Sequence, residues 1–157
     1  MGSGLLAEPR PELFRYCVTF HCGEQQGGDC ECTPLRPGVY ATEINLHNYH
    51  DAEVAVKKFV VPVVSAGAVI GREPRVVSVR AADKIVLPPY TATMDDCCRL
   101  AKLLFGGPAH ASTLTSGILE IVSRKPLAVT AVYTMRDPVS GAVSMDVEQI
   151  GGTRHVP

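Results

Sequence analysis

The sequence predicts a mainly β protein, an antiparallel two-sheet β-sandwich of about eight strands with one short crossover helix at about residues 94–105. Three observations lead to this fold class. Short segments of alternating apolar and polar residues recur along the chain, turn-forming residues separate them, and one segment alone has helical periodicity. The 157 residues suit one domain. We expect an N-terminal arm at 1–12, a sandwich domain at 13–150 and a C-terminal tail at 151–157.

The arm is predicted because Pro9 and Pro11 prevent regular structure near the N-terminus. If this arm is ordered, something outside the core must hold it. A neighbouring subunit is the simplest candidate.

The first three strands are predicted from alternating patterns at Leu13–His21, Val39–Asn48 and Ala52–Val64. A loop rich in Gly, Gln, Asp, Cys and Pro separates the first two, and a turn at 48–51 separates the next two. The long third strand would be a hazard as an open edge. We therefore expect pairing within an oligomer to cover it.

The middle of the chain predicts two short β segments and the helix. The β segments are Arg75–Arg80 and Lys84–Leu87, and the helix runs from about Met94 to Phe105. Thr93 is the expected N-cap, with Asp96 as the carboxylate of a capping box. Two glycines directly after the apolar stripe end the helix.

The C-terminal third predicts a meander of antiparallel hairpins. Its strands are Leu114–Ser123, Leu127–Thr134 and Ala142–Ile150, and the segments between them are turns rich in Pro, Gly and charged residues.

The composition argues against several classes of function. The net charge of −1 leaves no basic surplus to neutralise phosphates, so nucleic-acid binding is not expected. No apolar run is long enough for a membrane span or a signal peptide, so we expect a cytoplasmic protein. In that compartment, the six cysteines are expected to be thiols or ligands rather than a disulfide framework.

A cluster of Cys and His residues around the first loop is the first candidate site. Such residues are preferred zinc ligands, and a sulfur-rich loop could also take copper(I). The spacing lacks the Cys-x2-Cys pair of a zinc finger, so the alternative is a solvated loop with incidental thiols. The candidate ligands here are His21, Cys22, Cys30 and Cys32.

A second pair of candidate ligands, His47 and His50, follows at the end of the second strand. The loop around Cys22 would complete a site if it folded over this end of the sandwich. The alternative is that Asn45, His47, Asn48 and His50 cap a turn, with their side chains bonded to backbone groups.

Cys97 and Cys98 are candidate reactive thiols, because a helix N-terminus lowers a thiol's pKa. The neighbouring Asp95 and Asp96 oppose thiolate formation. Cys97 also falls on the apolar stripe, where Cys acts as a small hydrophobe.

Five segments of the sequence carry a resemblance to known proteins: Tyr40–Asn48, Lys57–Phe59, Met94–Cys97, Ile118–Val122 and Ala128–Thr134. They resemble a group of uncharacterised bacterial proteins and, more distantly, the sensory rhodopsin transducer family. The resemblance covers roughly residues 38–150. It implies a small β-sandwich that assembles as a tetramer and binds a membrane photoreceptor.

Catalytic motifs for phosphate, nucleotide, serine-hydrolase or zinc-protease chemistry are absent from the sequence. We therefore predict a non-enzymatic, homo-oligomeric scaffold or adaptor with a protein partner and no required cofactor. The alternatives are a zinc or copper protein that uses the Cys and His residues and a thiol-dependent enzyme or redox sensor.

Overall fold

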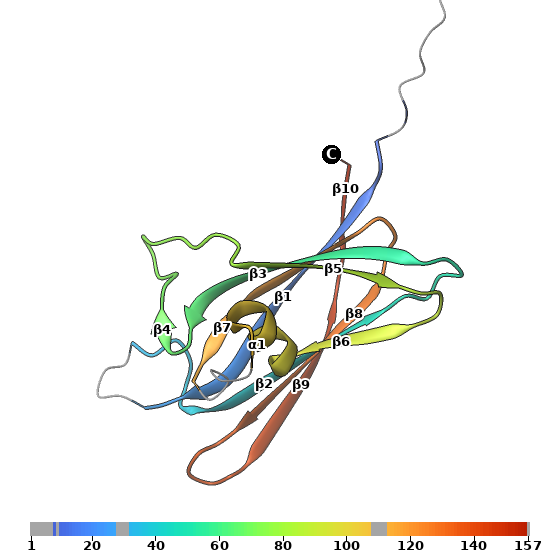
Figure 1. Ribbon diagram of the computed structural model, residues 1–157. Coiled ribbons are helices and arrows are strands. Elements are labelled where there is room, and N and C mark those ends of the chain that lie inside the picture. Colours follow the sequence, from blue (N-terminus) through green and yellow to red (C-terminus); the bar gives the residue numbers. More distant parts are fainter. Residues whose placement is uncertain (1–7, 9, 28–31, 108–112, 157) are drawn as a thin grey trace, which may run out of the picture.

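The computed structural model describes residues 8, 10–27, 32–107 and 113–156, in which ten strands and one helix occur (Figure 1). All ten strands belong to one hydrogen-bonded sheet with the main path β4-β3-β7-β1-β2-β8-β9, and the strand pairs are antiparallel. The mainly β prediction is confirmed. The elements are β1 (Leu13–Gln25), β2 (Gly38–His47), β3 (Val54–Ser65), β4 (Ala68–Val69), β5 (Ala81–Leu87), β6 (Ala92–Asp96), α1 (Cys97–Phe105), β7 (Thr115–Ser123), β8 (Ala128–Arg136), β9 (Val143–Ile150) and β10 (Thr153–His155).

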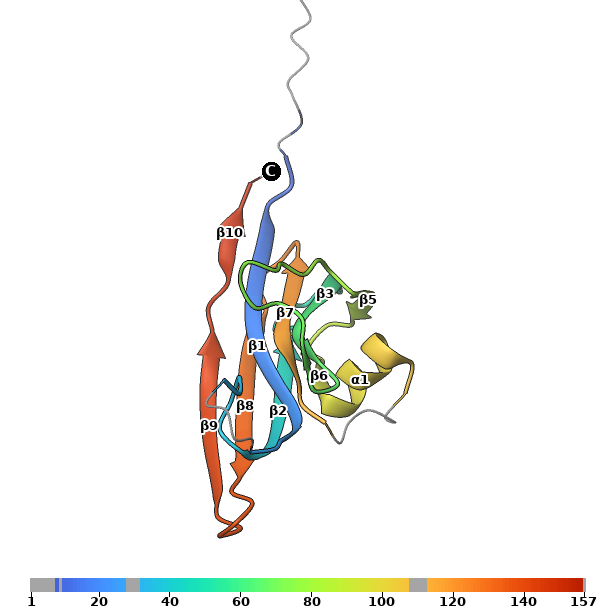
Figure 2. The same ribbon diagram turned by 90° about the vertical axis from the view of Figure 1, so that its left-hand side faces the viewer.

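The predicted pair of separate sheets is not observed, because β1 continues from one half of the sheet into the other (Figure 2). Its residues Phe14–Cys22 pair with β7, whereas Gly23–Gln25 pair with β2. The change of partner occurs at Gly23, whose φ of 96° favours a residue without a Cβ atom. A 13-residue strand thus makes one continuous sheet where sequence periodicity predicted two.

One hydrophobic core lies between the two halves of the sheet. It forms because successive side chains of a strand point to opposite faces, so every second residue is buried. Tyr16, Val18 and Phe20 of β1 follow this rule, as the alternating sequence predicts. The rest of the chain contributes Ile44, Leu46, Val54, Val56, Val60, Leu87, Leu100, Leu119, Ile121, Leu127, Val129 and Ala131.

The third strand, which we expected pairing within an oligomer to cover, is covered within the chain itself. β3 pairs with β7 on one side and with β5 on the other. Its contact with β7 is so close that a Cβ atom on Gly117 would lie 2.2 Å from the carbonyl oxygen of Val61, so glycine is required there. The main path of the sheet instead ends at β9.

The helix begins later than predicted, because residues 92–96 form β6 and pair with β2. The N-cap is Asp96 rather than Thr93, and its side chain accepts a hydrogen bond of 2.9 Å from the backbone N–H of Arg99. Gly106 ends the helix with a φ of 80°, as predicted. Across the described parts of the chain, no helical segment combines the length and apolar character needed to span a bilayer.

Two further segments differ from the prediction. Residues 75–80 form no strand, although β5 starts directly after them. The predicted C-terminal tail contains β10, which pairs with the start of β1, and Arg154 forms an ion pair with Glu12. Residues 1–7 and 9 of the predicted arm lie outside the described residues, as does Cys30 of the first loop. The three C-terminal strands lie within one or two residues of their predicted bounds.

Candidate functional site

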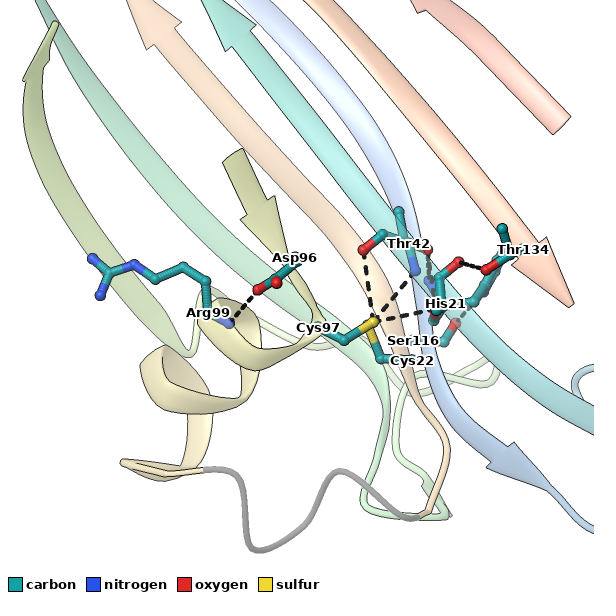
Figure 3. Close-up of a disulfide and its surroundings, with 9 residues drawn as sticks. His21, Cys22, Thr42, Asp96, Cys97, Arg99, Ser116 and Thr134 are labelled. Atoms are coloured by element: carbon teal, nitrogen blue, oxygen red, sulfur yellow. Dashed lines mark hydrogen bonds between the residues drawn. A yellow bond between two sulfur atoms is a disulfide. The ribbon is translucent and has the colours of Figure 1, made fainter. Parts of the chain in front are cut away.

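Cys22 and Cys97 form a disulfide, with 2.11 Å between their sulfur atoms and 5.6 Å between their Cα atoms (Figure 3). This differs from the sequence-based expectation that the cysteines are thiols or metal ligands. The strand pairing explains the difference, because it places buried Cys22 of β1 beside the first residue of α1. In this state, Cys22 is not an available zinc ligand and Cys97 is not an available nucleophile.

The disulfide lies next to the point where β1 stops pairing directly with β2. There the Thr42 side chain bridges the two strands (Figure 3). The Thr42 hydroxyl donates to the carbonyl oxygen of His21 at 3.0 Å and accepts from the backbone N–H of His21 at 2.9 Å. The backbone N–H of Thr42 lies 3.3 Å from the Cys97 sulfur. These contacts connect β1, β2 and α1 through buried side chains.

His21 is part of this polar cluster, and the described residues place no group of metal ligands around it. Its Nδ1 lies 3.2 Å from the Ser116 hydroxyl on β7. Burial lowers the pKa of His21, because the charged imidazolium would lose hydration there. A neutral His21 can form this hydrogen bond with Ser116 without placing a charged group in the partly buried part of the sheet.

Among the predicted metal ligands, Cys32 and His47 lie toward opposite ends of β2, whereas His21 lies beside Thr42 in the middle of the strand. The loop that contains Cys32 precedes Gly38, whereas His47 ends the strand. The ten residues of β2 span about 30 Å at roughly 3.3 Å per residue. Among the residues with described positions, no three His, Cys, Asp or Glu side chains are grouped as metal ligands would be.

Asn48 and His50 instead stabilise the turn after β2, which is the alternative that the sequence left open. The fully buried Asn48 side chain donates to the carbonyl oxygens of Ala52, Leu87 and Pro88 at 2.9–3.1 Å. Its Oδ1 accepts from the backbone N–H of His50 at 3.0 Å. The Nε2 of His50 lies 2.7 Å from the carbonyl oxygen of Pro126, to which it donates.

Replacing Asn48 by alanine is expected to lower the free energy of unfolding by about 2–3 kcal/mol, because buried backbone groups would lose their partners. Urea denaturation measures this change. Asn45→Ala is the matched control, since Asn45 is on the outer face of β2, the strand before this turn. Equal stability of the two variants would show that the turn does not depend on the buried amide.

Of the other cysteines that the structure describes, two lie away from the disulfide and one lies beside it. Cys17 is exposed on β1, and Cys32 is exposed in the loop before β2, where its carbonyl oxygen accepts from Arg72 at 2.7 Å. Cys98 is an exposed thiol next to the disulfide. It lines a surface pocket of about 220 Å³ with residues of β2, β6 and β8: Ala41, Thr42, Glu43, Asp96, Val132 and Thr134.

A buried ionic network is the main feature that the sequence-based search did not identify. Lys58 of β3 is 2% exposed, and its Nζ lies 2.8 Å and 3.0 Å from the two carboxylate oxygens of Asp95 on β6. The same Nζ lies 3.3 Å from Asp83 of β5, which also binds Arg99 of α1 at 2.7 Å. Two cations and two carboxylates from four elements thus form three ion pairs.

The charges in this network balance. Burial acts to raise the pKa of Asp83, but hydrogen bonds from Arg99 and Lys58 outweigh it and hold this pKa below its usual value. The sequence contained one signal of the network. Lys58 occupies an inward position of β3, between Val56 and Val60, and an inward lysine needs a buried partner.

The outer face of β9 carries a row of exposed apolar side chains. Val143, Met145 and Val147 are 68%, 69% and 60% exposed. They share one face because they alternate along the strand, and Val132 of β8 is directly opposite Val147. The β8–β9 hairpin extends beyond the rest of the sheet at one end (Figures 1 and 2).

The other face of β9 is acidic. Asp146 and Glu148 lie on it, beside Tyr133 of β8. Burial and the Glu148 carboxylate raise the pKa of Tyr133 to about 12. β9 thus combines an apolar face, an acidic face and, in the described structure, one edge without a strand partner.

Comparisons with known proteins give little further information. No family model and no curated protein match the chain. Among solved structures, the crystal structure of Thermotoga maritima 1070 is similar to it, with a TM-score of 0.47, 10% identity and coverage of 92% of this chain and 95% of that chain. A similarity at this level carries no argument about function.

Proposed function

We propose that the chain is a non-enzymatic, homo-oligomeric scaffold in which β9 of one copy pairs with β9 of a second copy. The observation that carries the proposal is the exposed apolar edge strand. An open edge with apolar side chains is a template for pairing with another chain, and proteins usually blunt it with charge, proline or a covering segment. In the described structure, the apolar row of β9 is exposed, and the charged residues of the strand, Asp146 and Glu148, lie on its other face.

The sequence of β9 suits antiparallel pairing with itself. In a register centred on Met145, the two Met145 side chains lie opposite each other and Val143 lies opposite Val147. Asp146 then lies opposite Ser144, so like charges are not directly paired. Apolar cross-strand pairs contribute roughly 0.2–1 kcal/mol each, and like charges in direct opposition are destabilising. This register therefore favours a second copy as the occupant of the edge.

The scaffold role follows from the extended sheet that such pairing would create. It would join two copies edge to edge and leave the outer faces of both available to a protein partner. The resemblance to the transducer family, whose members assemble, supports self-association as well. For the metal-binding alternative, the described residues supply no favourable observation, because Cys22 is in a disulfide and His21 and His50 contact other groups.

Met145→Lys is expected to convert the oligomer to a monomer. The ammonium group would lie opposite its own copy at the centre of the proposed register, where like charges repel. Native mass spectrometry and light scattering at micromolar concentration would show the change in mass.

Val76→Lys is the matched control, because Val76 is also apolar and highly exposed but lies outside the strands. It is expected to keep the wild-type mass. A wild-type protein that is monomeric at tens of micromolar, or a Met145→Lys variant that keeps the wild-type oligomer, would rule out assembly through β9.

A further inference from the structure

A groove on the outer face of the other half of the sheet combines positive charge with an apolar floor. It has a volume of about 440 Å³ and lies over β3, β5 and the end of β7. This size is within the range of small-molecule sites, roughly 300–1,000 Å³. Its cationic residues are Lys57, Lys84 and Arg124, and the other lining residues are Pro11, Leu13, Ala55, Val122 and Ser123.

The three cations of the groove form no ion pair or hydrogen bond through their side chains within the described residues. Arg15, on the same face, is by contrast paired with Glu120 at 2.7 Å. No acidic residue lines the groove. The groove therefore carries three uncompensated positive charges.

The strand register brings two of these charges into direct opposition. Lys57 of β3 pairs with Lys84 of β5, and side chains in such a pair lie on the same face about 5 Å apart at Cβ. Like charges in this position destabilise a sheet unless an anion lies between them. An anionic ligand would relieve this repulsion.

The third charge is held at the end of β7. Arg124 follows Ser123, whose hydroxyl donates to the carbonyl oxygen of Lys125 at 2.7 Å and so fixes the turn. Buried Ser123 and Val122 form the floor of the groove there. A guanidinium at this point can bind two oxygens of one phosphate group.

We propose that this groove binds a phosphate monoester with an apolar organic group. Lys57, Lys84 and Arg124 contact the phosphate, whose two negative charges suit the three cations, and the organic group packs against Leu13, Ala55 and Val122. The proposal is independent of self-association, because β9 lies in the other half of the sheet. It can therefore be tested on the Met145→Lys variant as well as on the wild type.

Phenyl phosphate is the probe, and isothermal titration calorimetry is the measurement. We expect it to bind more tightly than inorganic phosphate, which lacks the apolar group, and benzyl alcohol to show no binding. Lys84→Gln and Arg124→Gln are each expected to weaken the binding at least about tenfold, as for the loss of a charge-assisted hydrogen bond. Arg75→Gln, an exposed basic residue outside the groove, is the control and should bind as the wild type does.

Three results would overturn the proposal. They are an absence of phenyl phosphate binding at millimolar concentration, an affinity no higher than that for inorganic phosphate, and an equal loss of affinity in the Arg75→Gln control. Lys57, Lys84 and Arg124 are exposed, so these substitutions leave the core intact, and circular dichroism would verify the fold of each variant.

Discussion

Removal of the Cys22–Cys97 disulfide is expected to lower the free energy of unfolding by about 4 kcal/mol. The bond joins residues 75 positions apart, so it restricts the unfolded chain strongly. In the chain-entropy description, closure of a loop of this length accounts for roughly 4–5 kcal/mol. Urea denaturation of the Cys22→Ala/Cys97→Ala double variant, compared with the oxidised wild type, measures this difference.

The control for this experiment is Cys17→Ala/Cys98→Ala, which also removes two cysteines but leaves the disulfide in place. It is expected to change the stability by less than about 0.5 kcal/mol per site, because both residues are exposed. A reducing agent should destabilise the wild type and this control alike. If reduction leaves the wild-type midpoint unchanged, the bond contributes nothing to stability.

Lys58→Met is expected to destabilise the protein by about 3–5 kcal/mol. The substitution leaves the Asp95 carboxylate buried without its cation, and an uncompensated buried charge is far more costly than a paired one. Asp83 is less affected, because it keeps its hydrogen bond to Arg99. Thermal and urea unfolding would measure the loss.

The neighbouring Lys57→Met is the matched control, because the same substitution one residue earlier falls on the outer face of β3. It should have little effect on stability. The double variant Lys58→Met/Asp95→Leu is expected to recover much of the loss, since an apolar pair can replace a buried ion pair. If the double variant loses as much stability as the two single variants together, Lys58 and Asp95 contribute independently and do not stabilise the protein as an ion pair.

The alternation of apolar residues was sufficient to predict most strands. In β1, the buried positions Tyr16, Val18 and Phe20 follow directly from a period of two, because one face of the strand meets the core. Sequence periodicity does not record which strand is the neighbour. The continuity of the sheet through Gly23 therefore could not be predicted, and two sheets were expected in place of one.

The start of the helix shows a conflict between local and distant contacts. Thr93 and Asp96 satisfy a local capping pattern, but residues 92–96 pair with β2 and the helix begins after them. Backbone pairing with a strand some 50 residues earlier outweighed the local preference. Asp96 caps the helix, but as the N-cap residue itself and not as the capping-box carboxylate that supports Thr93.

The candidate site was predicted poorly for a similar reason. His21 and Cys22 lie beside Thr42 in the middle of β2, whereas His47 ends the strand and His50 follows it, and residue spacing alone does not show this separation. The disulfide instead joins Cys22 to a cysteine 75 positions along the chain, and the spacing of residues in the sequence does not predict such a partner. Lys58 and Asp95 are likewise 37 residues apart, so their pairing becomes visible when the strands are placed side by side.

The order of synthesis has a consequence for how β1 folds. β1 leaves the ribosome before its partner β7, which starts about a hundred residues later, with Val18 paired to Leu119. Until then, the residues of β1 that pair with β7 lack that partner, and pairings this distant in sequence form slowly. The nascent chain therefore carries the apolar face of β1 without β7 while the intervening residues are synthesised. A chaperone that binds extended apolar segments would have its longest access to this protein at Tyr16–Phe20.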